Sequence, residues 1–462
     1  MKSEAIYVAS QAWVQGTWAK DVLLTVAPNG TWKSVQPQAT PAQQVGATHL
    51  AGPVLPGLVN AHSHAFQRAI VGLTERRSLG AGASDDFWSW RDRMYSAANR
   101  VTPQQLEAIA SQLYTELLAG GYTQVCEFQY LHNNLDGTPY ARPVEMSLAL
   151  VRAAQRTGIG LTLLPTLYMR SGFTAIGLQA DQRRFASTPD SVMRVVEDVQ
   201  HQISQDKRIN CGVAIHSLRA ADPAALLELA ASAKKMGLPV HIHVAEQTQE
   251  VADCVHHTGQ RPIQWLLDHA EVDARWNLIH ATHTTPAELQ GVRASGASIV
   301  ICPATEANLG DGVFDLPGYA AAGGKWSIGS DSHVTRHWAE ELRLLEYSQR
   351  LTLRQRNIAA SVLGHQSSAA ALFESALAGG MAACGQPTGG LAAGQRADFV
   401  TLDPACPALL GMPGGYLLDA LVFSSPAAAL AEVFVAGQCK NPEALNVHTG
   451  DFARTMQQLW QA

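Results

Sequence analysis

The middle of the chain, from about residue 53 to residue 385, alternates short apolar runs with longer segments whose apolar residues recur every three to four positions. Apolar runs of four to eight residues are typical of buried strands, and the longer period is typical of amphipathic helices. The predicted strands cover residues 54–60, 122–127, 160–167, 211–216, 239–244, 276–280, 298–301 and 325–329. The clearest predicted helices between them cover residues 103–119, 143–157, 191–205 and 223–236.

This alternation predicts an α/β fold of the (β/α)8 barrel type. Eight strand–helix units over about 330 residues fit a closed barrel with insertions better than an open sheet. An open doubly wound sheet would normally carry a glycine-rich phosphate-binding turn after its first strand. The segment that follows the first strand here, Val59-Asn-Ala-His62, is not such a turn.

Both ends of the chain have a different sequence pattern, in which short runs of strand-forming residues are separated by glycine and proline turns. These runs lie at residues 5–9, 21–26, 396–403, 420–423 and 431–437. We expect them to form one small β-sandwich domain assembled from both termini. The predicted domains are residues 1–52 with 386–445 for the β-sandwich, residues 53–385 for the barrel, and residues 446–462 for a C-terminal helix.

The composition is that of a globular protein and predicts no nucleic-acid or membrane partner. Of the 462 residues, 47% are hydrophobic and 16% charged, which allows a large core and a smaller second one. A formal net charge of −6 offers no basic face for nucleic acid. No run of about 18 apolar residues that could span a membrane occurs, and the first ten residues lack the pattern of a signal peptide.

The seven cysteines are scattered along the chain and form no CxxC pair. An odd number of unpaired cysteines is typical of reduced thiols in a cytoplasmic protein, most of them buried as small apolar residues. A zinc site built from cysteines is therefore not expected.

The predicted carboxyl ends of the barrel strands carry many imidazole and carboxylate side chains. Catalytic groups of (β/α)8 enzymes lie at this end of the strands. In chain order the residues found there are His62, His64, Glu127, His216, His241, His243, Glu246, His280 and Asp331. Together they indicate a metal-dependent hydrolase.

His62 and His64 are two residues apart at the mouth of a buried strand. In an extended segment this spacing points both imidazoles to the same side, so both can reach one cation. Taken alone, the pair could equally be two exposed or hydrogen-bonded core histidines. Gly57 and the apolar residues before the pair favour metal binding.

A second strand end, His241-Ile-His243-Val-Ala-Glu246, supplies a third ligand. We expect His243 to bind the metal and Glu246 to reach over it as a proton shuttle without binding it. His241 faces the same side one layer deeper, and we interpret it as a core or supporting residue.

His280 and Asp331 end two further strands. His280 could be a fourth ligand, a residue that orients a ligand, or a hydrogen-bonding partner of the attacking water. Asp331 could bind the metal, accept a proton from its water, or do both, although a Gly-Ser-Asp turn is also a common helix cap. The fourth predicted strand, residues 211–216, contains no lysine that could bridge two metals after carboxylation, so one metal ion is expected.

Three motifs in this order, Pro56-Gly-Leu-Val-Asn-Ala-His62-Ser-His64, His241-Ile-His243-Val-Ala-Glu246 and Gly329-Ser-Asp331, resemble the signature of the amidohydrolase superfamily. The stretch from Gly390 to Asp398 resembles its returning β-domain segment, so the resemblance covers nearly the whole chain. For the mononuclear deaminase branch it implies one Zn²⁺ per chain. The implied ligands are His62, His64, His243 and Asp331, with His280 close to the metal and its water.

Longer motifs are similar to those of one family in this branch, the N-formimino-L-glutamate deiminases of histidine degradation. They span residues 65–69, 86–91, 127–132 and 214–219. The resemblance implies hydrolysis of N-formimino-L-glutamate to N-formyl-L-glutamate and ammonia by a homodimer. The implied catalytic residues are Glu246, His280 and Asp331.

The implied substrate carries two carboxylates, which need cationic and preferably bidentate partners. The resemblance assigns this end of the substrate to Gln67, Arg91, Tyr130, His216 and Arg219. By itself, Arg91 could belong to a solvated charge run, and Arg219 could form an ion pair with Asp222 at a helix start. Further candidates are Arg68, Arg93 and Arg336.

Two other functions stay open at this point. One is another deaminase of the same branch, acting on guanine, a methylthioadenosine-like nucleoside or a triazine, whose site would need aromatic stacking in place of two arginines. The other is a non-catalytic scaffold of the same fold, which would usually have lost its metal ligands. The same nitrogen and oxygen ligands could also hold Fe²⁺ or Mn²⁺.

Overall fold

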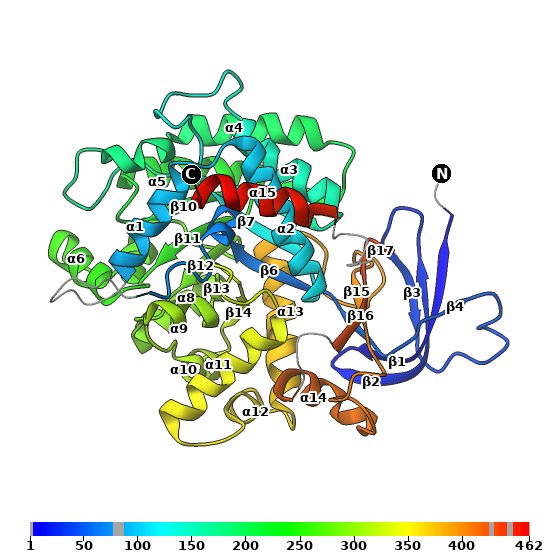
Figure 1. Cartoon of the computed structure of the whole chain (residues 1–462). Coiled ribbons are helices and arrows are strands. Elements are labelled where there is room, and N and C mark those ends of the chain that lie inside the picture. The colour runs from blue at the N-terminus through cyan, green and yellow to red at the C-terminus, as the bar shows by residue number, and fades with distance from the viewer. Residues whose placement is uncertain (1–2, 77–86, 425–428, 441–446, 462) are drawn as a thin grey trace.

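The computed structural model describes residues 3–76, 87–424, 429–440 and 447–461, and these residues form a barrel with a separate sheet beside it (Figure 1). The barrel strands are parallel and follow one another around the barrel in chain order. They are β6 (Leu58–Ser63), β7 (Tyr122–Gln129), β8 (Gly160–Leu167), β10 (Val213–Ser217), β11 (Val240–Val244), β12 (Trp276–His280), β13 (Ser298–Ile301) and β14 (Lys325–Ile328), with β9 (Ile209–Cys211) beside β8. The predicted (β/α)8 barrel is confirmed.

Contacts between the first and last strands close the barrel at the end where the site lies. The Asp331 amide donates to the His62 carbonyl at 3.0 Å, and the His64 amide donates to the Asp331 carbonyl at 3.2 Å. One layer deeper, the Asn60 side chain donates to Ser330 Oγ at 2.7 Å and accepts from the Ser330 amide at 2.8 Å. The two strands are therefore clamped by one amide side chain although they lie far apart in the chain.

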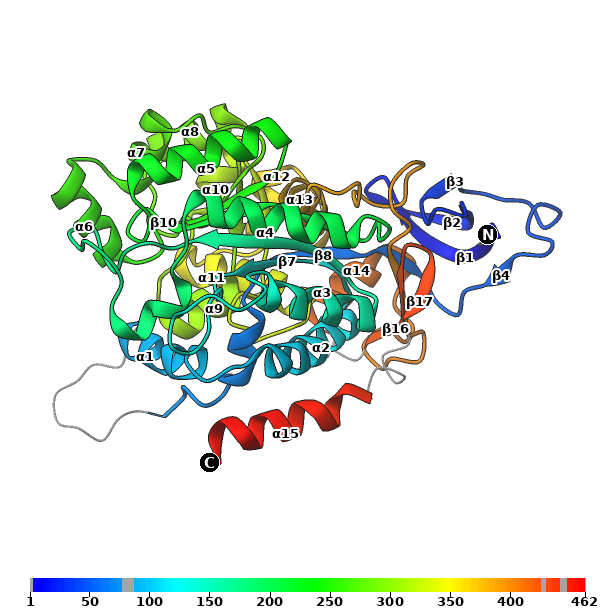
Figure 2. The ribbon, with the colours of Figure 1, turned by 90° about the horizontal axis from the view of Figure 1, so that it is seen from above.

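Helices cover the outside of the barrel, as the two views show (Figures 1 and 2). The helices are α1 (Phe87–Ala98), α2 (Pro103–Ala119), α3 (Glu145–Thr157), α4 (Pro189–Ile203), α5 (Pro223–Met236), α6 (Thr248–Thr258), α7 (Pro262–His269), α8 (Pro286–Ser295), α9 (Pro303–Leu309), α10 (Leu316–Ala321), α11 (Trp338–Leu353), α12 (Ile358–Leu363) and α13 (Ser368–Cys384), and 3-10 turns lie at η1 (Ala65–Ala69) and η2 (Ala180–Phe185). Several begin with a Thr-Pro pair in which the threonine accepts a hydrogen bond from the first turn, as Thr102 does for α2.

The second sheet takes strands from both ends of the chain, as expected. It contains β1 (Ala5–Val14), β2 (Thr17–Val26), β3 (Trp32–Gln36), β4 (Thr48–His49), β5 (Val54–Pro56), β15 (Phe399–Leu402), β16 (Leu430–Val435) and β17 (Gln438–Lys440). Their aromatic side chains form a separate core, in which Phe399 and Phe434 stack at 4.1 Å between ring centroids and Trp32 lies against Phe399. In Figure 1 this sheet lies to the right of the barrel.

Three details differ from the sequence-based expectation. The apolar run at residues 54–60 is not one strand, because it divides at Gly57: β5 pairs with β1 and β15, and β6 begins the barrel. The run at residues 211–216 likewise divides at Gly212, between β9 and β10. The prediction of a strand at residues 420–423 is wrong, because this segment lies in helix α14 (Leu417–Phe423). A short buried apolar run fits either a strand or a helix.

The chain ends in helix α15 (Thr449–Trp460), which packs on α2 and ties itself to the barrel by a hydrogen bond from Trp460 Nε1 to the Ala69 carbonyl at 2.9 Å. The expected border of this helix with the β domain, near residue 445, lies outside the described residues.

No helix in the part of the chain that the structure describes is long and apolar enough to cross a membrane. All seven cysteines are free thiols, and every one except Cys439 is buried, as predicted.

Candidate metal centre and active site

Four of the predicted site residues converge at the carboxyl end of the barrel. His62 and His64 leave β6 on the same side, His243 stands on β11, and Asp331 follows β14. His62 Nε2 lies 3.0 Å from His243 Nε2 and 3.3 Å from Asp331 Oδ1, while His64 Nε2 lies 3.4 Å from the same Asp331 oxygen. All four side chains are buried.

Hydrogen bonds fix which ring nitrogen of two of these histidines faces the centre. His64 Nδ1 lies 3.2 Å from the Phe128 carbonyl, and His243 Nδ1 lies 2.9 Å from the His216 carbonyl. Because a carbonyl oxygen only accepts, each Nδ1 carries the hydrogen and each Nε2 presents a lone pair. Burial and the neighbouring His62 lower the pKa of His64 to about 3, so this imidazole is neutral at physiological pH.

This donor set fits one divalent cation. The ligand atoms of a tetrahedral zinc site at 2.0–2.1 Å lie roughly 3.3 Å from one another. The three distances measured between the facing atoms, 3.0, 3.3 and 3.4 Å, are close to that value. Neutral imidazole nitrogens and a carboxylate oxygen are the ligand types that such a cation takes in proteins. His62, His64, His243 and Asp331 could therefore hold a single metal ion.

His280 lies beside this centre between three acidic side chains. Its Nε2 is 3.7 Å from Glu246 Oε1 and 3.8 Å from Asp331 Oδ2, and its Nδ1 is 3.2 Å from Glu306 Oε1. Burial alone would lower the pKa of His280, but the charge of Glu246 and hydrogen bonds with Cys302 and Glu306 outweigh it and raise this pKa well above its usual value. Burial raises the pKa of Glu246 to about 7 despite the opposing charge of His280.

The turns that carry these residues hold a strained backbone. Ala245, His280, Ala281, Asp331 and His333 all have positive φ angles, between 45° and 68°, although none is a glycine. Such a conformation costs about 1–3 kcal/mol per residue and persists only where surrounding contacts impose it. Here the positive φ angles lie at the ends of β11, β12 and β14, where the chain leaves the barrel next to the site residues.

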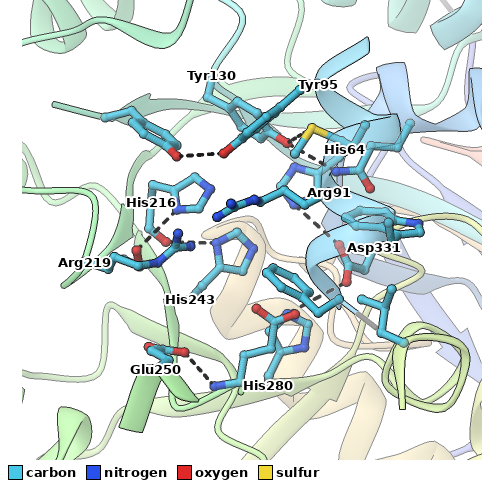
Figure 3. Close-up of a pocket in the computed structure, with 18 residues that line it drawn as sticks. His64, Arg91, Tyr95, Tyr130, His216, Arg219, His243, Glu250, His280 and Asp331 are labelled. Atoms are coloured by element: carbon cyan, nitrogen blue, oxygen red, sulfur yellow. Dashed lines mark hydrogen bonds and ion pairs between the residues drawn. The ribbon is translucent and has the colours of Figure 1, made fainter. Parts of the chain in front are cut away.

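The metal centre opens into a cavity at the carboxyl end of the barrel. The structure brings to its wall all of the residues predicted for substrate and catalysis. These are Gln67, Arg91, Tyr130, His216, Arg219, Glu246, His280 and Asp331. Figure 3 shows Arg91 and Arg219 on the side of the cavity away from His280.

The other predicted candidates lie elsewhere. Arg68 and Arg336 both pair with Glu116, at 2.7 and 3.1 Å, and Arg93 is exposed, so none of the three lines the cavity. His241 is buried below the site with Nε2 2.9 Å from the Ala383 carbonyl, as its interpretation as a core residue required. Asp86, the first residue of one of the long motifs, lies outside the described residues.

Several residues of the site were not predicted from the sequence. Glu306 reaches His280 from helix α9, and Glu250 accepts the backbone N–H groups of Ala245 and Glu246 at 3.1 and 3.0 Å. Two tyrosines, Tyr95 and Tyr168, line the cavity wall. Tyr168 directly follows the predicted strand 160–167, so its strand-end position could have drawn attention to it. Glu306, Glu250 and Tyr95 lie on helices, and only the tertiary structure brings them to the site.

Comparison with known proteins gives the family. The model of the amidohydrolase family matches residues 54–440. The chain belongs to the amidohydrolase family. This amidohydrolase is 43% identical over 434 residues to a formimidoylglutamate deiminase from Pseudomonas aeruginosa, covering 93% of each chain. It is 27% identical to a 5-methylthioadenosine/S-adenosylhomocysteine deaminase from Halobacterium salinarum, over 77% of this chain and 74% of the relative.

Solved structures agree with this assignment. An amidohydrolase from Brucella melitensis superposes with a TM-score of 0.91 at 41% identity, covering 98% of this chain and 99% of that one. An atrazine chlorohydrolase from Arthrobacter aurescens, crystallised with zinc, has a TM-score of 0.83 at 18% identity, over 98% of this chain and 100% of that one. At that identity the second likeness shows the fold alone.

Proposed function

We propose that this amidohydrolase hydrolyses N-formimino-L-glutamate to N-formyl-L-glutamate and ammonia, a step of histidine degradation, with one zinc ion per chain. The observation that carries the proposal is a cavity in which a metal-ligand cluster faces two arginines, Arg91 and Arg219. The 43% identical formimidoylglutamate deiminase supports the same substrate.

The metal would be held by His62, His64, His243 and Asp331, whose facing atoms have the spacing described above. A bound zinc ion supplies Lewis-acid polarisation and a water whose pKa is lowered to about 7. The neighbouring imidazoles, His62 first, hold the pKa of the Asp331 carboxyl below its usual range in spite of burial, so it is ionised at neutral pH.

The remaining residues supply proton transfers around the reacting carbon. The reaction adds water to the formimino carbon and breaks its bond to the terminal nitrogen, which leaves as ammonia. Asp331 would accept the proton of the attacking water, and His280, 3.8 Å away, would orient that water. Glu246, whose pKa of about 7 keeps a fraction of it protonated, would give a proton to the departing nitrogen.

The far side of the cavity would bind the two carboxylates of the substrate. Arg91 and Arg219 provide charge-assisted and potentially bidentate hydrogen bonds. Gln67 Nε2 donates a hydrogen bond of 3.2 Å to the Tyr130 hydroxyl, and both residues line the cavity. His216 completes this wall.

The decisive experiment measures ammonia release by the purified enzyme from N-formimino-L-glutamate, guanine and 5′-methylthioadenosine in parallel. We expect turnover of the first compound only. Preference for either purine compound would overturn the substrate assignment. Elemental analysis of the same preparation should find about one zinc per chain, and a folded but metal-free protein would favour a non-catalytic scaffold instead.

We further propose that the enzyme is a cytoplasmic homodimer. The seven cysteines form no disulfide in the structure, which is compatible with that compartment. Light scattering of the purified protein should give a mass of two chains, and a monomer would contradict the proposal.

A further inference from the structure

Two buried tyrosines on the cavity wall have no role in the site described so far. Tyr95 comes from helix α1 and Tyr168 follows strand β8, and both line the cavity. Their hydroxyl oxygens lie 3.5 Å apart. Gln182, in the 3-10 turn η2, places its Nε2 2.9 Å from the Tyr95 hydroxyl and 3.1 Å from the Tyr168 hydroxyl.

The orientation of the Gln182 amide is set by its other end. Its Oε1 accepts the backbone N–H of Gln179 at 3.1 Å, so the NH₂ group must face the tyrosines. Both amide hydrogens are then donated, one to each phenol oxygen. Each tyrosine consequently accepts from Gln182 and keeps its own hydroxyl hydrogen for another acceptor.

At most one of those two hydrogens can be used between the tyrosines, because one hydroxyl can donate to the other. The 3.5 Å separation makes even that bond a weak one. Burial and the neighbouring Tyr95 raise the pKa of Tyr168, so this hydroxyl stays protonated. At least one phenolic O–H is thus available to an acceptor in the cavity, and a buried donor that lacks an acceptor is costly.

The surroundings of the pair select a negatively charged acceptor. The Arg91 guanidinium lies over the Tyr95 ring with its Cζ 5.4 Å from the centroid. Both Arg91 and Arg219 act electrostatically on the Tyr168 hydroxyl, which places it near both cations. Figure 3 shows Tyr95 on the same side of the cavity as Arg91 and His216.

The pair also lies one layer away from the metal ligands. The Tyr168 ring contacts His216 at 4.4 Å between centroids, and His216 in turn contacts His243 at 5.1 Å. In N-formimino-L-glutamate the α-carboxyl carbon is three bonds from the formimino carbon, whereas the side-chain carboxyl carbon is five bonds away. Because the His216 ring separates the tyrosine pair from the metal ligand His243, the pair is better placed to contact the farther, side-chain carboxylate.

We infer that the Tyr95–Tyr168 hydroxyl pair, oriented by Gln182, is a specificity element that donates a hydrogen bond to the side-chain carboxylate of the substrate. This inference rests on the proposed function and adds a recognition group to it. The two tyrosines contact the substrate, and Gln182 acts through them as a positioning residue.

The test compares two substrates in the purified, metal-containing enzyme. N-formimino-L-glutamate carries the side-chain carboxylate, and N-formimino-L-norvaline has a methyl group in its place. We expect at least one of the single variants Tyr95→Phe and Tyr168→Phe to raise the KM for the glutamate compound about 10- to 100-fold, with kcat little changed. This is the range for a hydrogen bond to a charged group. The kcat/KM for the norvaline compound, measured at high enzyme concentration, should change less than about threefold.

Gln182→Glu tests the positioning step with nearly the same shape. A carboxylate at this position would accept the phenolic hydrogens instead of donating to the phenol oxygens, so we expect it to reproduce the substrate-selective loss. Tyr319→Phe is the matched control, because Tyr319 is a fully buried tyrosine whose hydroxyl bonds the Ala297 carbonyl away from the cavity. It should leave both substrates unaffected.

Each outcome has a separate meaning. Equal losses on both substrates would show that the pair only supports the fold, and unchanged KM values in both tyrosine variants would show that it does not bind the carboxylate; either result overturns the inference. If the unaltered enzyme releases no ammonia from N-formimino-L-glutamate, the proposed function itself fails and takes this inference with it.

Discussion

Single hydrogen bonds decide which atom each catalytic side chain presents. The imidazole of His243 faces the centre with a lone pair because its other nitrogen donates to a backbone carbonyl. Glu306 plays the corresponding part for His280, since its carboxylate lies 3.2 Å from Nδ1 and also accepts the Cys302 amide at 2.9 Å. The proposed proton transfers would therefore depend on the residues that orient these imidazoles as well as on the imidazoles themselves.

Glu246→Gln tests the proposed proton donor. The amide keeps the shape of the side chain but cannot donate an acidic proton, so we expect kcat to fall by about 10²–10⁴-fold. The metal content should stay unchanged, because Glu246 is not among the proposed ligands. Glu228→Gln, on the exposed face of α5, is the control. Wild-type turnover by Glu246→Gln would remove this residue from the mechanism.

Glu306→Gln tests the orientation of His280. A neutral acceptor replaces a charged one, which weakens the bond to Nδ1 by about 1–2 kcal/mol. We expect kcat to fall roughly 5- to 30-fold with KM almost unchanged, because Glu306 lies behind His280 and does not line the substrate cavity. A change confined to KM would argue against this role.

At the scale of whole elements, the positions at which strands and helices end determine where the site residues lie. Strained turns with positive φ follow β11, β12 and β14, where the chain leaves the barrel next to the site residues. At the opposite end of the barrel, helices stop at glycines in the left-handed conformation, which avoids that strain. Helix α5, for example, ends at Gly237 with φ of 66°.

The helix stop at Gly237 allows a direct measurement of this backbone preference. A Cβ added there would meet no heavy atom within 4 Å, so Gly237→Ala adds left-handed strain without a clash. We expect the free energy of unfolding to fall by about 1 kcal/mol in urea titrations. Gly415→Ala, which also has open space but no positive φ, should change it by less than about 0.5 kcal/mol.

At the scale of the whole molecule, a buried ion pair joins the β domain to the floor of the barrel. Arg396 Nη2 lies 2.6 Å from Asp398 Oδ2 and also donates to Gln124 Oε1 of strand β7 at 2.9 Å. Asp398 in turn accepts the Ala436 amide at 2.9 Å. The segment from Gly390 to Asp398, which resembles a β-domain motif of the family, thus connects the two sheets. Its Arg396 and Asp398 side chains make that connection.

Breaking one partner of this pair should be costly. Arg396→Met leaves Asp398 buried without its counter-charge, and we expect a loss of about 3–5 kcal/mol in the free energy of unfolding. Adding Asp398→Asn removes the unpaired charge while its side-chain oxygen can still accept the Ala436 amide. The double variant should therefore be more stable than Arg396→Met alone in thermal or urea unfolding. If the two are equally unstable, the ion pair is not the cause.

The sequence by itself determined the barrel, its parallel order and the chemistry of its strand ends. Periodicity and caps are local signals, which is why the predicted helices Pro103–Ala119 and Pro223–Met236 agree with the structure at both ends. The placement of His62, His243 and Asp331 was equally accessible, because strand ends of a barrel must converge.

Only the tertiary structure decided the contacts between residues that no local pattern links. Gln182 meets Tyr95 across 87 positions of the chain, and Glu306 meets His280 across 26. The division at Gly57 and the helical state of α14 likewise depend on which sheet or helix packs against a short apolar run. Local preference decides an element when its signal is long and periodic, and packing decides it when the signal is short.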